Sequence, residues 1–298
     1  MSDQLTSDSR LLIYASEQYL LPADKVESRR LDAQHRMITT LYEGKLSVAP
    51  TKLASGDRVL ESAAGTGIWA LEFFDKNSAD GIILDVECID ISSAQFPTGH
   101  PPQLHFSVHS VVNLPNPEWS NQFAYAHQRL LVFAMNSSLW RSAVSELFRV
   151  IKPGGWLELF EMEAQNLPSW SVGPNSARLA TLIQALLGAK GIIGDLSVYL
   201  PGILGKAGFV NVKCEPRCVS IGGEATTGDR ASARGYSSEL WRGIWRGTKG
   251  PVIESRGYGV VETVEEYDAL VEASVCEWRA SKETYMTYYI ILAQKPGI

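Results

Sequence analysis

A short stretch at residues 59–70, VLESAAGTGIWA, constrains the fold more than any other part of the chain. It begins as an apolar strand, passes through a run of small residues and continues as a helix. Gly65 and Gly67 let the backbone turn sharply, so that main-chain N–H groups at the helix start can approach a ligand. The pattern G-x-G-x-x-A also fits a dinucleotide site, and a tight turn without any ligand fits it too. The stretch therefore predicts an α/β fold and leaves the ligand open.

Two carboxylates narrow the choice of ligand. Glu61 stands at the end of the first strand, four residues before Gly65, where it would repel a pyrophosphate but suits an ammonium group. Asp90 ends the next apolar segment, at 82–90, where a carboxylate can accept hydrogen bonds from both ribose hydroxyls. Asp90 thus supports a bound nucleoside, and Glu61 argues against an NAD(P)-linked oxidoreductase.

Apolar strands alternate with helices along most of the chain, which predicts parallel strands joined by helical crossovers. The predicted strands are 57–61, 82–90, 103–108, 123–127, 156–161, 209–214 and 285–293. One predicted helix carries Trp140, Val144, Leu147 and Ile151 on one face and is broken by the sequence KPGG at 152–155. The other predicted helices are 66–76, 175–189, 195–207 and 262–281. Together these elements predict a seven-stranded, doubly wound, Rossmann-like α/β sheet that ends in an antiparallel pair.

Helical segments outside the sheet suggest the domain organisation. Residues 11–45 are predicted to be helical, with Leu31, His35, Ile38 and Tyr42 on one face. We therefore expect an N-terminal helical cap at 1–50 and a core domain at 51–298. A helical insertion at about 217–282 is expected within the core. Trp241 and Trp245, four residues apart on this insertion, fit a buried core better than an aromatic pocket.

Composition excludes several classes of protein. The net charge of −6 argues against nucleic-acid binding, which draws on clustered Lys and Arg. The polar N-terminus has no apolar signal segment, and no apolar run reaches the length of a membrane span. Four scattered cysteines and five histidines lack the paired spacing of a metal site. We expect a cytoplasmic protein with free thiols, no metal and no membrane contact; the sequence leaves its oligomeric state open.

Five segments carry a family resemblance. They are residues 59–70, CIDIS at 88–92, LP at 114–115, HQRLL at 127–131 and FRVIKPGGW at 148–156. Together they resemble class I S-adenosylmethionine-dependent methyltransferases. An early RLDAQH at 30–35 narrows the resemblance to a fungal group. That group includes the secondary-metabolism regulator of the velvet complex and tailoring enzymes of natural-product clusters.

The resemblance implies that S-adenosylmethionine is the cofactor and assigns residues to it. Glu61 would hold the methionine amino group, Asp90 the ribose, and Ile91 would pack on the adenine. Further cofactor-lining residues would be Ala63, Gly65, Gly67, the pair Ser110–Val111, and Gln128, with His127 and Gln128 near the transferring methyl.

Three positions depart from the family pattern. Ala63 replaces the usual first glycine, which is tolerable if its φ angle is negative. Ser110 replaces an aspartate that accepts from the adenine amino group, and Ala124 replaces an aspartate that opens the fourth strand. Loss of the acid at position 110 would weaken cofactor binding by about 1–3 kcal/mol.

The expected function is methyl transfer to a small metabolite in fungal natural-product biosynthesis, to an oxygen in preference to a nitrogen. A base would help to deprotonate an oxygen acceptor, and His35 and His127 are the candidates. A buried structural histidine is an equal alternative for each. His100, His105 and His109 are interpreted as surface or strand residues. The alternative functions are a non-catalytic regulator that binds the cofactor and a protein partner, and the oxidoreductase.

Overall fold

A seven-stranded sheet forms the centre of the molecule in a computed structural model, which describes residues 19–164, 170–222 and 229–297. The strand order is β3-β2-β1-β4-β5-β7-β6. The strands are β1 Arg58–Ser62, β2 Asp85–Asp90, β3 Leu104–Val108, β4 Phe123–Arg129, β5 Ile151–Met162, β6 Val210–Ser220 and β7 Tyr285–Gln294. Strands β1 to β5 are parallel, and β7 lies antiparallel between β5 and β6. The predicted doubly wound α/β sheet with a final antiparallel pair is confirmed.

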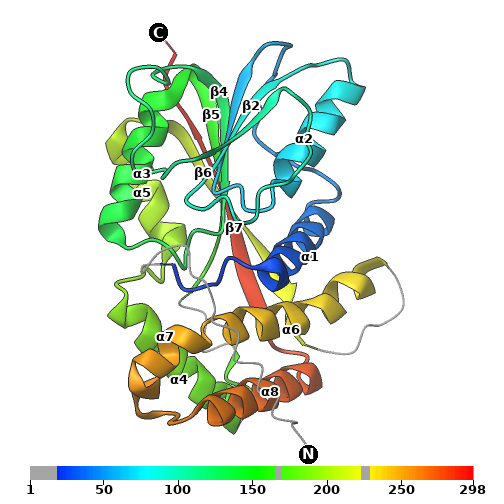
Figure 1. Cartoon of the computed structure of the whole chain (residues 1–298), viewed down its shortest axis with the longest axis vertical. Coiled ribbons are helices and arrows are strands. Elements are labelled where there is room, and N and C mark those ends of the chain that lie inside the picture. The colour runs from blue at the N-terminus through cyan, green and yellow to red at the C-terminus, as the bar shows by residue number, and fades with distance from the viewer. Residues whose placement is uncertain (1–18, 165–169, 223–228, 298) are drawn as a thin grey trace, which may run out of the picture.

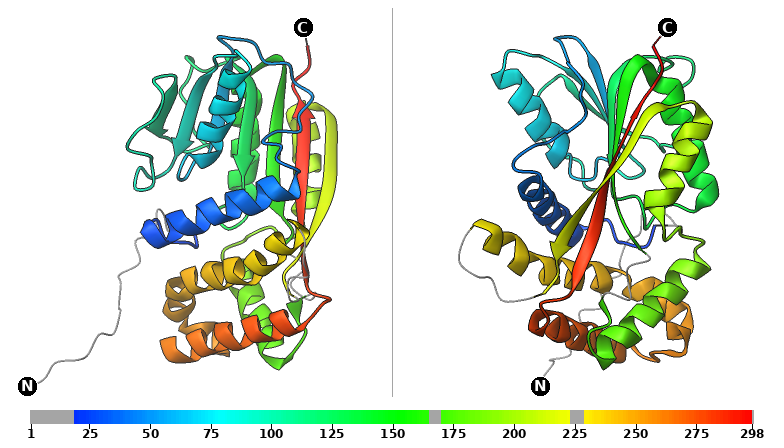
Figure 2. Two further views of the ribbon diagram at one scale, coloured as in Figure 1. Left: turned by 90° about the vertical axis from the view of Figure 1, so that its right-hand side faces the viewer. Right: turned by 180° about the vertical axis from the view of Figure 1, so that it is seen from behind.

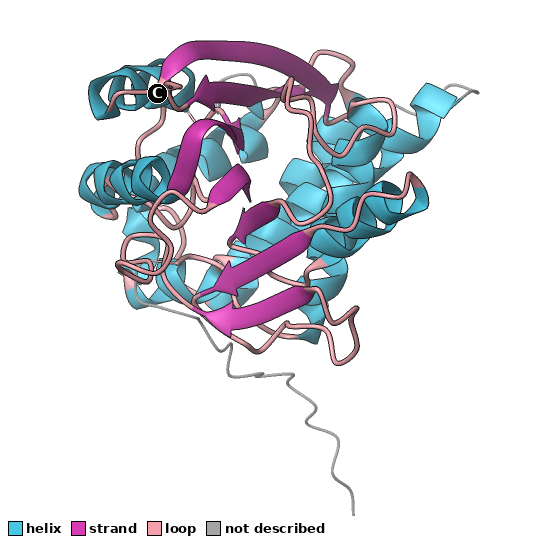
Figure 3. Ribbon diagram, turned by 90° about the horizontal axis from the view of Figure 1, so that it is seen from above, coloured by secondary structure: helices cyan, strands magenta, loops and turns pink. Residues whose placement is uncertain are grey.

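Helices cover both faces of this sheet (Figure 1, Figure 3). Helix α2 (Ile68–Ala79) lies on one face, and α3 (Ser137–Val150) and α5 (Leu196–Ala207) lie on the other. Side chains alternate between two cores because successive residues of a strand point to opposite faces. Val59 packs against α2 with Trp69 and Phe73, whereas its neighbour Leu60 joins the larger core on the other face.

A layer of helices lies beyond the carboxyl ends of the parallel strands (Figure 1, Figure 2). It contains α1 (Lys25–Leu41), α4 (Pro174–Ala189), α6 (Asp229–Gly247), α7 (Lys249–Glu254), a 3-10 turn η2 (Arg256–Gly259) and α8 (Val264–Ala280). Helix α6 packs against both α1 and α8, and α4 packs against α8. Four buried tryptophans hold this layer together, with Trp170 lying 4.5 Å from Trp241, 5.5 Å from Trp245 and 5.9 Å from Trp278 between ring centroids. Trp241 and Trp245 are therefore core residues.

The N-terminal helix begins later than the sequence predicts. Helix α1 starts at Lys25, after Asp24 caps it by accepting hydrogen bonds from the backbone N–H groups of Val26 and Glu27, each at 2.8 Å. Residues 19–24 are not helical, so the predicted helix over 11–45 is wrong there; residues 11–18 lie outside the described part of the chain. The capping carboxylate, which satisfies orphan N–H groups, sets the true start.

Other element boundaries also differ from the predicted ones. Helix α3 ends at Val150, and Ile151 opens β5, which runs through the KPGG segment instead of starting after it. The β4–β5 register is irregular there, because Phe123 pairs with Ile151 and Tyr125 with Trp156. Strand β2 begins at Asp85 and β6 extends to Ser220, so the expected insertion follows residue 220. The predicted boundary at residue 50, between an N-terminal helical cap and the core domain, stays a prediction.

Three further findings concern cysteines, membrane-spanning helices and metal sites in the part of the chain that the structure describes. All four cysteines are free. No helix among the described residues is long and apolar enough to cross a membrane. No cluster of three or more His, Cys, Asp or Glu side chains that could hold a metal occurs in the described ranges.

Glu277 offers a test of the helical layer. Its carboxylate, on α8, accepts from the backbone N–H groups of Asn175 at 3.0 Å and Ser176 at 2.7 Å, in the first turn of α4. These bonds lower the pKa of Glu277 despite its partial burial. We expect Glu277→Ala to reduce the free energy of unfolding by about 1–2 kcal/mol at pH 7. Because a lowered pKa gives stability that is lost as pH falls, the deficit should shrink at pH 3. Urea unfolding at both pH values measures this, with the exposed Glu283→Ala as control; an unchanged deficit at pH 3 contradicts the assignment.

Candidate active site

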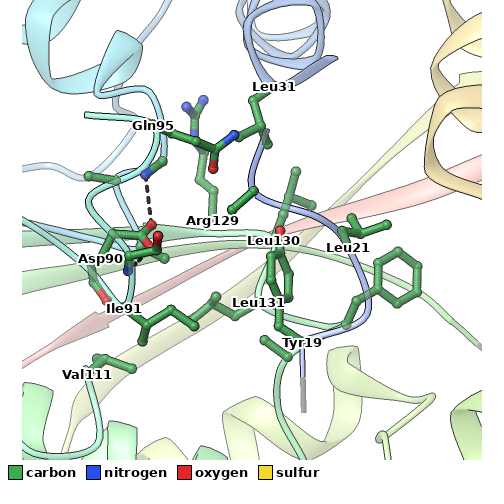
Figure 4. A pocket seen from close by; sticks show the side chains of 18 of the residues that line it. Tyr19, Leu21, Leu31, Asp90, Ile91, Gln95, Val111, Arg129, Leu130 and Leu131 are labelled. Atoms are coloured by element: carbon green, nitrogen blue, oxygen red, sulfur yellow. Dashed lines mark hydrogen bonds between the residues drawn. The ribbon is translucent and has the colours of Figure 1, made fainter. Parts of the chain in front are cut away.

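A cavity of about 360 Å³ lies between the carboxyl ends of β1, β2 and β4 on one side and helices α1 and α6 on the other. Parallel strands bring their ends to one edge of a sheet, which is why side chains distant in sequence meet here. In Figure 4, Asp90, Ile91 and Val111 lie at one side of the cavity, and Tyr19, Leu21 and Leu130 at the other. Eight of the predicted site residues line it: His35, Glu61, Ala63, Gly65, Asp90, Ile91, Ser110 and Val111.

Asp90 is held in place by the backbone around it. Its two carboxylate oxygens accept from the N–H groups of Gly65 at 2.9 Å and Ser92 at 3.1 Å. Burial raises the pKa of Asp90, and the backbone hydrogen bonds oppose this rise. Ile91 follows as a 40% exposed apolar side chain on the cavity wall, with Val111 also lining it. This combination of a fixed carboxylate and apolar neighbours suits the ribose and base of a nucleoside.

The glycine turn forms as the sequence predicts, but two expectations about its residues are wrong. Gly65 and Gly67 have φ angles of 54° and 72°, in the left-handed region. A Cβ on Gly67 would come within 2.6 Å of the Phe106 ring, so this glycine is needed for packing against β3 and does not line the cavity. Ala63 has φ 57°, and the condition of a negative angle is therefore wrong. An alanine in this region is strained, because its Cβ crowds the backbone.

Glu61 and His127 form a buried pair at the ends of β1 and β4. Glu61 Oε2 lies 2.5 Å from His127 Nδ1, and the imidazole stacks on the Trp69 ring at 3.8 Å between centroids. Burial raises the pKa of Glu61 and lowers that of His127. Glu61 lines the cavity, but His127 lies behind it. His127 is expected near the transferring methyl, but its ring does not reach the cavity lining, because it is buried between Glu61 and the Trp69 ring.

Gln128 also lies outside the cavity lining. Its Oε1 accepts from the Ser62 hydroxyl at 3.0 Å, and the side chain is fully buried. His127 and Gln128 lie on opposite faces of β4, because successive residues of a strand point to opposite faces of the sheet. Ala124 is buried at the start of the same strand. Its carbonyl oxygen lies so near Gly155 that a Cβ at position 155 would come within 2.9 Å of it.

His35 lines the cavity, yet both of its ring nitrogens are engaged. Nε2 lies 2.8 Å from Glu72 Oε2, and Nδ1 lies 3.1 Å from Arg129 Nη2. A guanidinium can only donate, so Nδ1 presents its lone pair to Arg129 and the ring proton lies on Nε2. Burial, followed by the charge of Arg129, lowers the pKa of His35. The lone pair that a general base would use is occupied.

Three residues that the sequence analysis gave no role belong to this site. Arg129 and His109 line the cavity, and His109 meets the Trp119 ring edge-on at 5.7 Å. Glu161 lies behind the cavity wall and accepts from the backbone N–H groups of Leu131 at 2.8 Å and Val132 at 3.1 Å. Of these three residues, only Arg129 could have been found from the sequence, because it is a cation at the end of a predicted strand, as Glu61 is an acid at the end of another. The positions of His109 and Glu161 in the site depend on tertiary packing.

The cavity wall opposite the nucleoside end is apolar. It is formed by the segment after β4 and by single side chains from neighbouring elements. The lining residues of this apolar wall are Leu130, Leu131, Val132, Phe133, Met135, Leu139, Met162 and Ile244. Because Glu161 fixes the backbone of this segment, the wall has a defined shape. Such a wall suits an apolar small molecule.

Comparisons with known proteins agree with this geometry. The methyltransferase domain family matches residues 59–155. The chain is 29% identical over 183 residues to methyltransferase grgD of a Penicillium species, covering 60% of this chain and 64% of that protein, slightly under two thirds. It is 31% identical over 195 residues to N-methyltransferase sirN of Leptosphaeria maculans, covering 65% and 67%. It is 25% identical over 288 residues to the secondary metabolism regulator LAE1 of Gibberella fujikuroi, covering 94% and 88%.

The fold, the glycine turn and these relatives place the chain among the class I S-adenosylmethionine-dependent methyltransferases. Within that class it belongs with the methyltransferases of fungal secondary metabolism. Its cofactor is S-adenosylmethionine, and the carboxylate of Asp90 beside the cradle at Gly65 fits the adenosine end of that molecule. The NAD(P)-linked alternative is set aside.

The strain at Ala63 predicts a stabilising substitution. Ala63→Gly should relieve the left-handed strain, which exceeds the entropy cost of a glycine in the unfolded chain, and raise the free energy of unfolding by about 0.5–1 kcal/mol. Calorimetric affinity for S-adenosylhomocysteine should be unchanged. Ala64→Gly, at a neighbouring residue whose φ is not positive, is the matched control and should destabilise; a loss of stability in Ala63→Gly would contradict the strain.

Glu161 predicts a pH effect. Burial raises the pKa of Glu161 to about 8, above that of an unfolded glutamate. The folded state therefore holds the proton more tightly, and the associated stability, complete below the unfolded pKa, is lost as pH rises toward 8. Relative to Glu161→Gln, the wild type should lose stability between pH 5 and pH 9. Thermal unfolding of both proteins across this range measures the difference, and parallel curves would contradict the raised pKa.

Proposed function

We propose that this protein transfers the methyl group of S-adenosylmethionine to a nitrogen or an acidic hydroxyl of a small, largely apolar metabolite. The observation that carries the proposal is the single cavity that joins the Asp90 carboxylate to the apolar wall after β4. A nucleoside and an apolar acceptor can therefore be held together in one cavity. Bringing two reactants into contact is the main task of such a site.

The chain's own residues act by holding and enclosing the reactants. When bound, the cofactor supplies a methyl group that its sulfonium already activates. Asp90 would hold the ribose hydroxyls, and Glu61 the methionine amino group. Helices α1 and α6 cover the side of the cavity opposite the strand ends through Leu31 and Ile244, which limits the access of water.

The proposed choice of acceptor atom rests on the hydrogen bonds of His35, which leave it unable to act as a base. The sequence favours an oxygen acceptor with His35 or His127 as base, but His127 lies behind the wall and the lone pair of His35 faces Arg129. Among the described lining residues, the remaining histidine is His109, near Ser110 at the nucleoside end. An amine, or a hydroxyl acidic enough to ionise in water, needs no protein base. The N-methyltransferase among the relatives supports a nitrogen acceptor.

A non-catalytic regulator is the second candidate. One observation favours it: the alignment with the regulator LAE1 spans 288 residues, more of this chain than the alignment with sirN. That length includes the helical layer. A regulator would bind the cofactor through the same residues and would use a surface for a protein partner.

A transfer assay separates the two candidates. The protein is incubated with methyl-labelled S-adenosylmethionine and a panel of aromatic amines, phenols and aliphatic alcohols. We expect label in the amines or phenols and none in the aliphatic alcohols, whose hydroxyls need a base. Cofactor binding without transfer to any compound, together with a stable complex with another protein, would favour the regulator.

His35 supplies the mechanistic prediction. Glutamine can still donate to Glu72 and accept from Arg129, so His35→Gln should keep turnover within a few-fold and leave the kcat–pH profile unchanged. A general base would contribute about 10²–10⁴ in rate. Steady-state kinetics between pH 5 and pH 9 measures this. If turnover collapses while cofactor affinity and melting temperature match the wild type, His35 is the base and this mechanism is wrong.

A further inference from the structure

Arg129 is a cation that lines the cavity and has no anionic partner among the residues that the structure describes. It ends β4, its side chain is half-buried, and it lines the cavity together with Leu31 and Gln95 (Figure 4). Burial lowers the pKa of Arg129, and the charge of Glu61 is the strongest influence that opposes this. Its one hydrogen bond to a side chain in the described part of the chain goes to His35. A guanidinium has five N–H donors, so most of its capacity is unused.

The acidic side chains around Arg129 are committed to other groups. Glu72 binds His35, and Glu61 binds His127. Glu158 accepts from the backbone N–H groups of Val48 and Ala49 and from other neighbours. Arg129 makes no ion pair with any described residue. A half-buried cation that faces a cavity and has no counter-ion there is suited to an anionic ligand.

The direction of Arg129 is fixed from α1. His35 Nδ1 accepts from Nη2, and the proton on His35 Nε2 is directed to Glu72 of α2. His35 therefore orients the guanidinium and leaves its remaining donors available. The base predicted from the sequence is better described as a positioning residue.

The ligand of the proposed function carries a suitable anion. Strands β1 and β4 are neighbours in parallel register, with Glu61 opposite His127 and Ser62 opposite Gln128, so Glu61 and Arg129 end adjacent strands. An acid and a cation side by side match the zwitterionic amino-acid end of S-adenosylmethionine. We propose that Arg129 binds the carboxylate of that end and thereby distinguishes the cofactor from nucleosides that lack it. This inference rests on the proposed function for the identity of the ligand.

A pair of ligands that differ by one group tests the proposal. S-adenosylhomocysteine has the carboxylate, and S-adenosyl-3-thiopropylamine is the same molecule without it. Isothermal titration calorimetry with the full chain should show that the wild type prefers the carboxylate-bearing ligand by about 10- to 100-fold, the range of a charge-assisted hydrogen bond. In Arg129→Met the preference should vanish, because the affinity for S-adenosylhomocysteine falls and that for the amine does not.

Two further variants serve as a fallback and a control for this experiment. Arg129→Lys keeps the charge but not the forked donors, so it should retain part of the preference, and it carries the test if Arg129→Met does not fold. Arg30 lines the same cavity and is already paired with Glu27 at 2.6 Å. Arg30→Met should therefore affect both ligands equally.

The outcomes separate this inference from the proposed function. Equal weakening of both ligands in Arg129→Met, or no change in either, overturns the carboxylate assignment. A wild type that binds both ligands equally well also overturns it, and the transfer assay is unaffected. Retained discrimination with no transfer to any acceptor contradicts the proposed function alone.

Discussion

The parallel pairing of β1 with β2 and β4 is the constraint on which the rest of the molecule depends. It brings the carboxyl ends of three strands to one edge, and Glu61, Asp90 and Arg129 all stand at that edge. Charged side chains can gather there because the strands end and the backbone turns away, leaving space between the sheet and the helices. The glycine turn before α2 keeps this space open. Without the register of β1 against β4, the acid and the cation would not adjoin.

Burial of these ionisable groups is a cost that the fold meets by hydrogen bonding. Asp90 is bound by two backbone N–H groups, and Glu161 by two others. Glu61 is matched by His127. These bonds are local and rigid, so they orient the carboxylates as well as satisfying them. Arg129 departs from this rule, since its imidazole partner carries no negative charge. That departure distinguishes a residue kept for a ligand from one kept for the fold.

The helical layer completes the site by closing it. Residues from α1 and α6 line the cavity, although these helices are about 200 positions apart in the sequence. Helix α6 is held in place by the buried tryptophans and by α8, which packs against both α4 and α6, and α1 packs on α6. The acceptor wall after β4 is held from behind by Glu161. The shape of the proposed acceptor wall is therefore set by elements remote from the cofactor motifs.

The sequence by itself determined the sheet, its glycine turn and the two carboxylates, Glu61 and Asp90, that line the cavity. Strand periodicity, Gly65 and the acids at 61 and 90 are local signals, because each is needed by the backbone or the ligand within a few residues. Tertiary structure decided the rest. The left-handed angle at Ala63 follows from how the turn must meet the sheet. The face on which His127 lies follows from the alternation and register of β4. The pairing of His35 with Glu72 and Arg129 joins three elements, and no spacing along the chain encodes such a meeting.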